Sequence, residues 1–143
     1  MISKILKNKG REVVSVAPNA PVLSVARVLT ERGIGAALVR DPAGALLGII
    51  SERDIVRGMA NQGQGTTQLP AEKLMTRDLV TVTPQTRVSE AMELMTRRRV
   101  RHLPVLENGQ LTGLVSIGDL VKLRIDEAEH EAAELKAYVV SAG

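Results

Sequence analysis

The sequence predicts a mixed fold of helices and strands, α+β (α/β), built from two β-α-β-β-α repeats and a C-terminal helix. Three observations support this fold: two groups of residues occur twice, each repeat has an amphipathic helical spacing, and each contains a hairpin. The repeated words are Val14-Ser15-Val16-Ala17-Pro18 with Val80-Thr81-Val82-Thr83-Pro84, and Gly48-Ile49-Ile50-Ser51-Glu52-Arg53-Asp54 with Gly113-Leu114-Val115-Ser116-Ile117-Gly118-Asp119. Duplicated units of this kind usually stack and bury faces that neither can bury alone.

Each repeat starts with a short β segment, residues 13–16 and 79–82, which a proline ends. An amphipathic helix follows, because apolar residues recur at positions i, i+3, i+4 and i+7. These residues are Val22, Val25, Ala26 and Leu29 in the first copy, and Val88, Ala91, Met92 and Met95 in the second. Thr86 is the expected N-cap of the second helix, whereas Ala20 at the matching place cannot cap.

A β-hairpin and a second short helix complete each repeat. The predicted strands are 36–40 and 46–50 in the first copy, and 103–106 and 111–115 in the second. Asn108-Gly109 is a strong hairpin turn signal because both residues tolerate a positive φ. The closing helices are expected to begin near Ser51 and Ser116, whose hydroxyls can cap the first N–H groups.

The predicted organisation is an N-terminal segment (1–10), repeat 1 (11–60), a linker (61–72), repeat 2 (73–125) and a C-terminal helix (126–143). Residues 61–70 are polar, contain glycine and lack periodicity, so we expect a loop there. From Leu120 on, apolar residues follow a heptad-like spacing: Val121, Ile125, Ala128, Ala132, Leu135 and Val139. This seam packs either on the body of its own chain or on a partner subunit.

Composition excludes disulfide-bonded proteins, thiolate metal sites, thiol catalysis and membrane-spanning proteins. The 143 residues carry a net charge of only +3, contain no cysteine, and have no apolar run long enough to span a membrane. The N-terminus has lysines but lacks the apolar core of a leader peptide, so we expect a cytoplasmic location. Tyr138 is the only aromatic residue, so the stacking platforms of single-stranded nucleic-acid modules are missing.

The repeated Gly-x-x-Ser-x-x-Asp is the candidate chemical motif. Ser51 and Ser116 each open a helix whose N–H groups favour an anion such as phosphate. Asp54 and Asp119 follow one turn later on the same side, where a carboxylate can accept both hydroxyls of a ribose. The simpler interpretation is that the serines are caps and the aspartates interact with the helix dipole. Retention in both copies favours a nucleotide geometry.

The densest basic run is Arg97-Arg98-Arg99-Val100-Arg101-His102. It is either a solvated helix C-terminus or a phosphate clamp. A metal site from the distant His102 and His130 is improbable, because zinc sites usually have three or four protein ligands. No Walker glycine loop, dinucleotide fingerprint or serine–histidine–acid arrangement is present, so no catalytic residue is assigned.

The chain resembles a tandem of cystathionine β-synthase (CBS) domains, a Bateman module, over residues 10–125. The resemblance rests on the repeated segments together with Leu74-Met75-Thr76 and Arg101-His102-Leu103-Pro104-Val105. The resemblance implies a stand-alone regulatory protein, with no catalytic cofactor, whose repeats pack about a pseudo-twofold axis. It also implies a homodimer that binds AMP, ADP, ATP, NAD(H) or S-adenosylmethionine.

The family pattern assigns site roles to particular residues. It places Asp54 and Asp119 on the ribose, Ser51 and Ser116 on phosphate or ribose, and Arg101 and His102 near the pocket of Asp54, where Arg53 can add charge. The remaining implied ligand-binding residues are Val14, Ser15, Val16, Val80, Thr81, Val82, Leu103 and Pro104. Gly35-Ala36 and Gly118 replace basic residues of the pattern beside Asp119, so the Asp54 pocket ranks first.

Three functions remain open at this point. The first is an adenine-nucleotide sensor, which transmits its ligand state to an unknown downstream protein by a conformational change. The second is a structural or adaptor dimer whose clefts bind nothing. The third, and the least favoured, is a nucleic-acid binder that uses the basic run, whose binding would depend steeply on salt.

Overall fold

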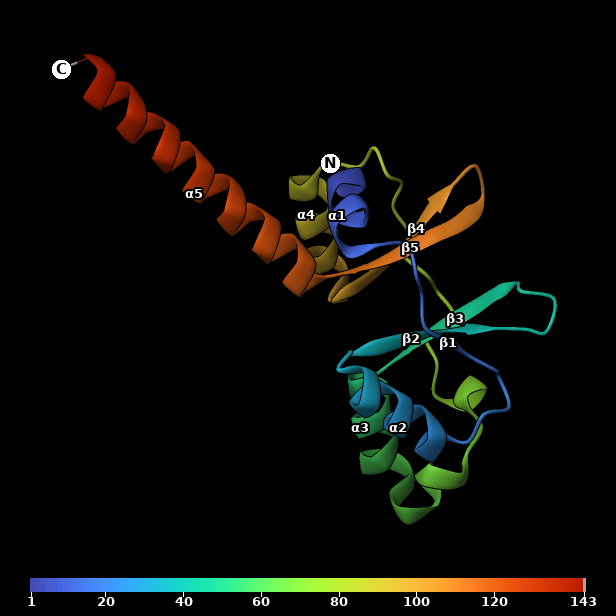
Figure 1. Ribbon diagram of the computed structural model, residues 1–143. Helices are drawn as coiled ribbons and strands as arrows, with labels where there is room; N and C mark the ends of the chain where they lie inside the picture. The colour runs from blue at the N-terminus through green and yellow to red at the C-terminus, as the bar shows by residue number, and fades with distance from the viewer. Residues whose placement is uncertain (143) are drawn as a thin grey trace. The chain divides into compact units, whose positions relative to one another are not determined.

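The computed structural model describes residues 1–142, and helices and strands alternate along the chain as expected (Figure 1). The chain divides into two compact units. One unit is Glu12–Val80, and the other joins Met1–Arg11 to the part of the chain from Thr81 on. The predicted class, two mixed repeats with a C-terminal helix, is confirmed.

The unit Glu12–Val80 contains a three-stranded sheet in the order β1-β2-β3. Its elements are β1 (Ser15–Val16), α2 (Val22–Arg32), β2 (Ala36–Arg40), β3 (Leu46–Ser51) and α3 (Glu52–Gln62). Strand β1 pairs in parallel with β2, and β2 pairs antiparallel with β3. The buried face of α2 joins strand residues in one core, made of Val25, Leu29, Ala37, Val39, Ile50, Ala71 and Met75.

The segment that follows α3 differs from the open loop expected at 61–70. Two 3₁₀ helices lie here, η1 (Gly63–Gln68) and η2 (Ala71–Lys73). Thr66 is buried, and its hydroxyl donates to the carbonyls of Gly58 (3.1 Å) and Gly63 (2.7 Å). The prediction of a loop was wrong because the buried Thr66 hydroxyl satisfies backbone acceptors inside the unit, although residues 61–65 are exposed as their polarity suggests.

The other unit contains a two-stranded antiparallel sheet, β4 (His102–Glu107) with β5 (Gln110–Ser116). Helix α4 (Val88–Arg98) precedes this hairpin, and α5 (Ile117–Ala142) follows it. The strand expected at 79–82 is reduced to a single bridge between Val82 and Val105. The closing helix of repeat 2 and the C-terminal helix are one element, with no break near residue 126, and the last residue of the predicted 126–143 segment lies outside the described residues.

Two details of this unit correct the sequence analysis. The N-cap of α4 is Arg87 rather than Thr86, whose hydroxyl instead accepts from the N–H of Thr83 at 3.0 Å. The N-terminal segment forms a helix, α1 (Ile2–Lys9), that Gly10 ends. Ile2, Ile5 and Leu6 are buried on one face of α1, and their i, i+3, i+4 spacing in the sequence is typical of a helix.

Candidate functional site

The first candidate aspartate, Asp54, lies at the start of α3 within a capping box. Its Oδ2 accepts from the N–H of Ser51 at 2.9 Å and from the Ser51 hydroxyl at 3.0 Å. In return, the Ser51 hydroxyl accepts from the N–H of Asp54 at 3.3 Å. The capping interpretation is therefore realised in the structure. The cap occupies mainly Oδ2 of Asp54. Because a carboxylate can accept about four hydrogen bonds, Oδ1 can still accept others.

The second oxygen of Asp54 has longer contacts. The Thr76 hydroxyl donates to Oδ1 at 3.3 Å, and the guanidinium of Arg57 lies 3.7 Å away. The Arg57 side chain is 71% exposed and the Asp54 side chain 8%, so a mobile cation covers a buried anion. A ligand hydroxyl that reaches Oδ1 would displace only weak interactions.

Gly48 explains how Thr76 comes close to Asp54. Ile49 and Thr76 exchange two backbone hydrogen bonds, of 3.0 and 2.8 Å, which bring the segment before Val80 against β3. A Cβ on Gly48 would lie 2.7 Å from the Thr76 carbonyl oxygen, a distance that real Cβ atoms do not adopt. The expectation that this glycine permits a close backbone approach is confirmed.

A hollow of about 410 Å³ lies beside β1 in the same unit, and its lining includes Ser15, Val16 and Arg40. Val14 is held by the backbone, because its carbonyl accepts from the N–H of Leu38 at 3.0 Å. The size lies within the range of small-molecule pockets. Ser15 and Val16 thus line a hollow and Val14 does not, while Arg53 lies in the first turn of α3 and is exposed.

The second candidate aspartate, Asp119, repeats the capping arrangement at the start of α5. Its Oδ2 accepts from the N–H of Ser116 at 2.8 Å, and the Ser116 hydroxyl accepts from the N–H of Asp119 at 3.2 Å. Asp119 also lines a hollow of about 340 Å³ together with Lys9 and Lys122. The two copies of the motif therefore share one local geometry.

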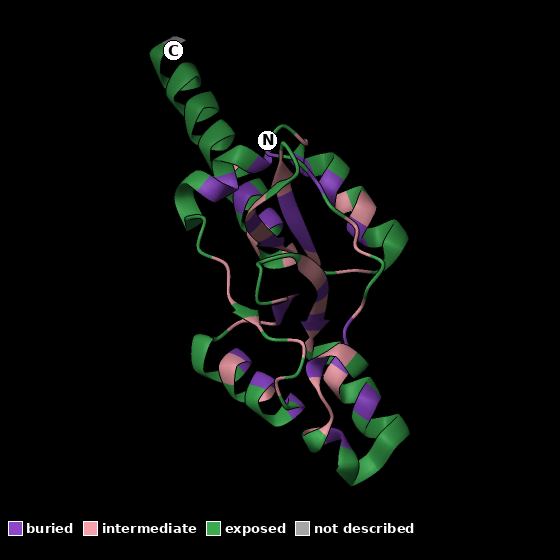
Figure 2. Cartoon of the chain, turned by 90° about the vertical axis from the view of Figure 1, so that its right-hand side faces the viewer, coloured by how far each residue is buried: buried purple, intermediate pink, exposed green. Residues whose placement is uncertain are grey.

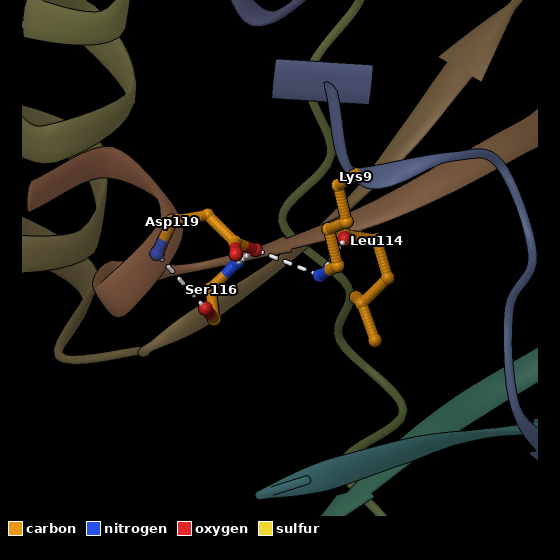
Figure 3. Close-up of polar contacts among 4 residues, drawn as sticks. All are labelled: Lys9, Leu114, Ser116 and Asp119. Atoms are coloured by element: carbon orange, nitrogen blue, oxygen red, sulfur yellow. Dashed lines mark hydrogen bonds and ion pairs between the residues drawn. The ribbon is translucent and has the colours of Figure 1, made fainter. Parts of the chain in front are cut away.

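The carboxylate of Asp119 forms an ion pair with a lysine, Lys9, and this ion pair distinguishes the second site from the first. Figure 3 shows the Lys9 side chain reaching Asp119, where Nζ lies 2.7 Å from Oδ2, and Nζ also donates to the Leu114 carbonyl at 2.9 Å. Burial alone would raise the pKa of Asp119. The hydrogen bond and positive charge of Lys9 and the hydrogen bonds from Ser116 outweigh burial, and they lower the pKa below its ordinary value of 3.8.

Gly113, the counterpart of Gly48, makes room for α1. A Cβ at Gly113 would lie 2.5 Å from Cδ2 of Leu6, so the glycine accommodates a side chain of that helix. The amino end of α1 is fixed as well, because the N–H groups of Ile2 and Ser3 donate to the carbonyls of Thr86 and Pro84 at 2.9 Å. The packing of α1 thus holds Lys9 beside Asp119.

The other predicted site residues lie along the start of repeat 2 and along β4. Val82 is buried and bonds to β4 through the Pro104 carbonyl and the Leu106 N–H. Leu103 and Pro104 are buried in β4, Arg101 is exposed just before it, and His102 is half-buried at its first position. Val80 is half-buried and Thr81 is exposed.

Sequence reasoning missed Thr76, Arg57 and Lys9 as site residues. Thr76 belonged to a recognised word, but its contact with Asp54 depends on the bridge to Ile49, which local sequence does not encode. Arg57 is three residues after Asp54, a helical spacing that could have indicated it. Lys9 lies 110 residues from Asp119, and only the packing of α1 brings the two together.

The described residues offer neither a metal site nor a membrane-spanning helix. No cluster of three or more histidine, aspartate or glutamate side chains within residues 1–142 could hold a metal ion. In the same part of the chain, no helix combines the length and apolar character needed to cross a membrane.

Known proteins are similar to this chain in sequence and in fold. A model of the CBS domain matches residues 8–61 and again residues 71–126. The CBS domain-containing protein CBSX3, mitochondrial, of Arabidopsis thaliana is 36% identical over 146 residues, which cover 96% of this chain and 71% of that protein.

Two solved structures extend the comparison. The CBS-domain containing protein ATU1752 from Agrobacterium tumefaciens is 41% identical with a TM-score of 0.85, over 86% of this chain and 92% of that one. The CBS domain protein PAE2072 from Pyrobaculum aerophilum, solved in complex with AMP, is 30% identical with a TM-score of 0.72, over 82% of this chain and 88% of that one. The chain therefore belongs to the CBS domain family and contains two CBS repeats.

Proposed function

We propose that the protein is a regulatory module that binds an adenosine nucleotide and passes its ligand state to another protein. The observation that carries the proposal is the Ser–Asp capping box, which occurs at Ser51/Asp54 and again at Ser116/Asp119. A related CBS pair has been solved with AMP. The ligand class is AMP, ADP, ATP or NAD(H), and the module has a regulatory rather than a catalytic role.

Asp54 is the principal ribose site in this proposal. Its Oδ1 faces only the 3.3 Å contact to Thr76 and the 3.7 Å contact to Arg57, so a ribose diol can replace them at low cost. Arg57 is free to rotate toward a phosphate, because most of its side chain is exposed. Ser15 and Val16 of β1, which pairs with β2 in the same unit, would frame the base. Arg101 and His102 belong to the other unit, and their role at the phosphate stays a prediction.

Asp119 is the weaker site, because a ligand there must first displace Lys9. The 2.7 Å ion pair and the hydrogen bond to Leu114 hold the Lys9 ammonium where a ribose hydroxyl would bind. This argument from contacts agrees with the ranking from sequence, where Gly118 removes a charge beside Asp119. The homodimer, the unknown downstream protein and the cytoplasmic location belong to the same proposal.

The test is calorimetric titration of the full chain with AMP, ADP, ATP, NAD and S-adenosylmethionine, on the parent protein and on Asp54→Glu. Glutamate at this third helical position preserves a capping box, but it moves the carboxylate by one methylene. Hydrogen bonds to a charged group contribute about 1.5–3 kcal/mol each, so Asp54→Glu should weaken binding at least about tenfold.

Two results would contradict the assignment. Equal affinity in the parent and Asp54→Glu would remove Asp54 from the site, and no binding of any of the five compounds would favour the adaptor alternative. Thermal melts control for folding, since a variant with an unchanged melting temperature loses affinity only through the site. The absorbance spectrum gives a first indication, because the chain has one tyrosine and no tryptophan, so co-purified nucleotide would dominate near 260 nm.

A further inference from the structure

Helix α5 exposes an apolar seam that its own unit leaves uncovered. The seam residues, all of which are exposed, are Val121, Ile125, Ala128, Ala132, Leu135 and Val139. Figure 2 shows the C-terminal part of α5 in the colour of exposed residues. The larger ones, Ile125, Leu135 and Val139, are 52–64% exposed. Of the two alternatives left open by the sequence, packing of the seam on the body of its own unit is not found among the described residues.

A different face of α5 packs on the body of the unit. Leu120 is fully buried and Leu123 is 5% exposed, and these residues hold the first turns of the helix in place. If the seam residues are taken as the a and d positions of a heptad repeat, Leu120 and Leu123 fall at c and f, on the opposite side of the helix. Lys4 and Asn8 of α1 line a hollow on this c/f side together with Glu127 and His130. The intramolecular packing thus orients the seam away from the unit.

The charges beside the seam identify a fitting occupant. The e positions are Lys122, Glu129 and Lys136, and the g positions are Arg124, Glu131 and Tyr138. In a parallel two-stranded coiled coil, each g residue faces the next e residue of the other helix. Arg124 then faces the partner's Glu129, and Glu131 faces the partner's Lys136. Both charged pairs are opposite in sign, and each occurs twice by symmetry.

The antiparallel arrangement brings together like charges. In this arrangement, the residues at a positions of one helix pack on the residues at d positions of the other, about a twofold axis near His130. Residues at e positions then face e positions of the partner, and residues at g positions face g positions of the partner. Glu129 would then face the partner's Glu129, Glu131 the partner's Glu131, and Lys122 the partner's Lys136. Like charges directly opposite each other are unfavourable, so electrostatics selects one direction.

We propose that residues 121–139 of α5 form a parallel, in-register coiled coil with a second copy of this chain. The two alanine layers, Ala128 and Ala132, contribute little apolar area, and the flanking charge pairs set the direction and the partner. The pairing would join two sensor chains at their C-terminal helices, and it holds whether or not nucleotide binds.

The absence of cysteine gives a clean test with the full chain. In the parallel register, residue 132 lies beside its own copy, so Ala132→Cys should form a disulfide-linked dimer under mild oxidation. In the antiparallel register, residue 132 lies beside residue 128 of the other helix and the single variant should stay reduced. His130→Cys at the f position is the matched control and should not cross-link. Failure of Ala132→Cys to cross-link, or equal cross-linking of both variants, overturns the proposal.

A charge exchange tests the pairing without a covalent bond. Arg124→Glu places like charges opposite each other and should shift the dimer toward monomer, by at least about threefold in dissociation constant in sedimentation equilibrium. The double variant Arg124→Glu/Glu129→Arg restores the pair in the opposite sense, so it should recover the parent value. Glu134→Arg, a reversal at a c position, is the control and should change little. No rescue in the double variant, or a monomeric parent at every concentration, contradicts the proposal.

Discussion

Replacing Lys9 by methionine should open the second aspartate site. The substitution keeps the apolar stem of the side chain but removes the ammonium, which lies 2.7 Å from Asp119 and 2.9 Å from the Leu114 carbonyl. The Asp119 carboxylate then keeps its contact with the helix start, where Oδ2 accepts from the N–H of Ser116 as Oδ2 of Asp54 accepts from the N–H of Ser51. The ligand would no longer have to displace a charge from the position of the ribose hydroxyl.

The size of the effect follows from the two lost interactions. The Lys9 side chain is 41% exposed, so its ion pair with Asp119 is screened by solvent and contributes at most about 1 kcal/mol. The hydrogen bond to Leu114 adds about 0.5–1 kcal/mol. Removing this competition, about 1–2 kcal/mol in total, should tighten nucleotide binding at Asp119 about 5- to 30-fold.

The assay is calorimetry with AMP on Lys9→Met in the Asp54→Glu background, so that the heat reports on the second site. Lys7→Met, on the same helix and exposed, is the charge-matched control and should leave affinity unchanged. Unchanged affinity in Lys9→Met would show that the lysine does not compete with the ligand. Weaker binding would show that Lys9 contacts the phosphate, and it would refute the competition argument.

The remaining predictions concern stability. In denaturant titrations at pH 7, Lys9→Met should lower the unfolding free energy by about 1–2 kcal/mol, the sum of the same two interactions. Because the folded pKa of Asp119 is lowered, the ion-pair part of this contribution is present above pH 3.8 and is lost as the pH falls through the folded pKa, so the gap between the parent and variant curves should narrow in acid to the part that comes from the Leu114 hydrogen bond; a gap that does not narrow would contradict the ion pair. Gly48→Ala should destabilise the protein by about 1–3 kcal/mol, because its Cβ would overlap the Thr76 carbonyl oxygen, whereas Gly65→Ala, with open space around it, should cost less than about 1 kcal/mol. Equal losses of stability in the two glycine variants would argue against the close approach of β3 and Thr76.

The repeated segments predicted the fold because they contain the hairpin strands and the helix starts of both repeats. The hairpins are as expected: the strands predicted at 36–40 and 46–50 are Ala36–Arg40 and Leu46–Ser51 in the structure. Ser51 and Ser116 open their helices, since a serine followed by an aspartate three residues later can form a reciprocal cap from local contacts alone. Elements defined by neighbouring residues could thus be predicted from the sequence.

The elements that were missed depend on contacts between distant residues. The buried apolar residues of helix α1 span little more than one helical turn, from Ile2 to Leu6. The helix is stabilised because these side chains are buried against the part of the chain from Thr81 on. The sequence around Thr66 predicts a loop, whereas in the structure the Thr66 hydroxyl donates to the carbonyls of Gly58 and Gly63. The occupation of Asp119 by Lys9 follows from the same long-range packing, so the difference between the two sites could only be seen in the structure.

The contact between the Asp54 carboxylate and a ribose diol can be tested most directly by changing the ligand and leaving the protein intact. Calorimetry would compare whichever nucleotide binds best with its 2′,3′-dideoxy analogue on the unmodified chain. We expect the analogue to bind at least about tenfold more weakly, because two charge-assisted hydrogen bonds are lost. Equal affinities for the two compounds would contradict the central role of the aspartate.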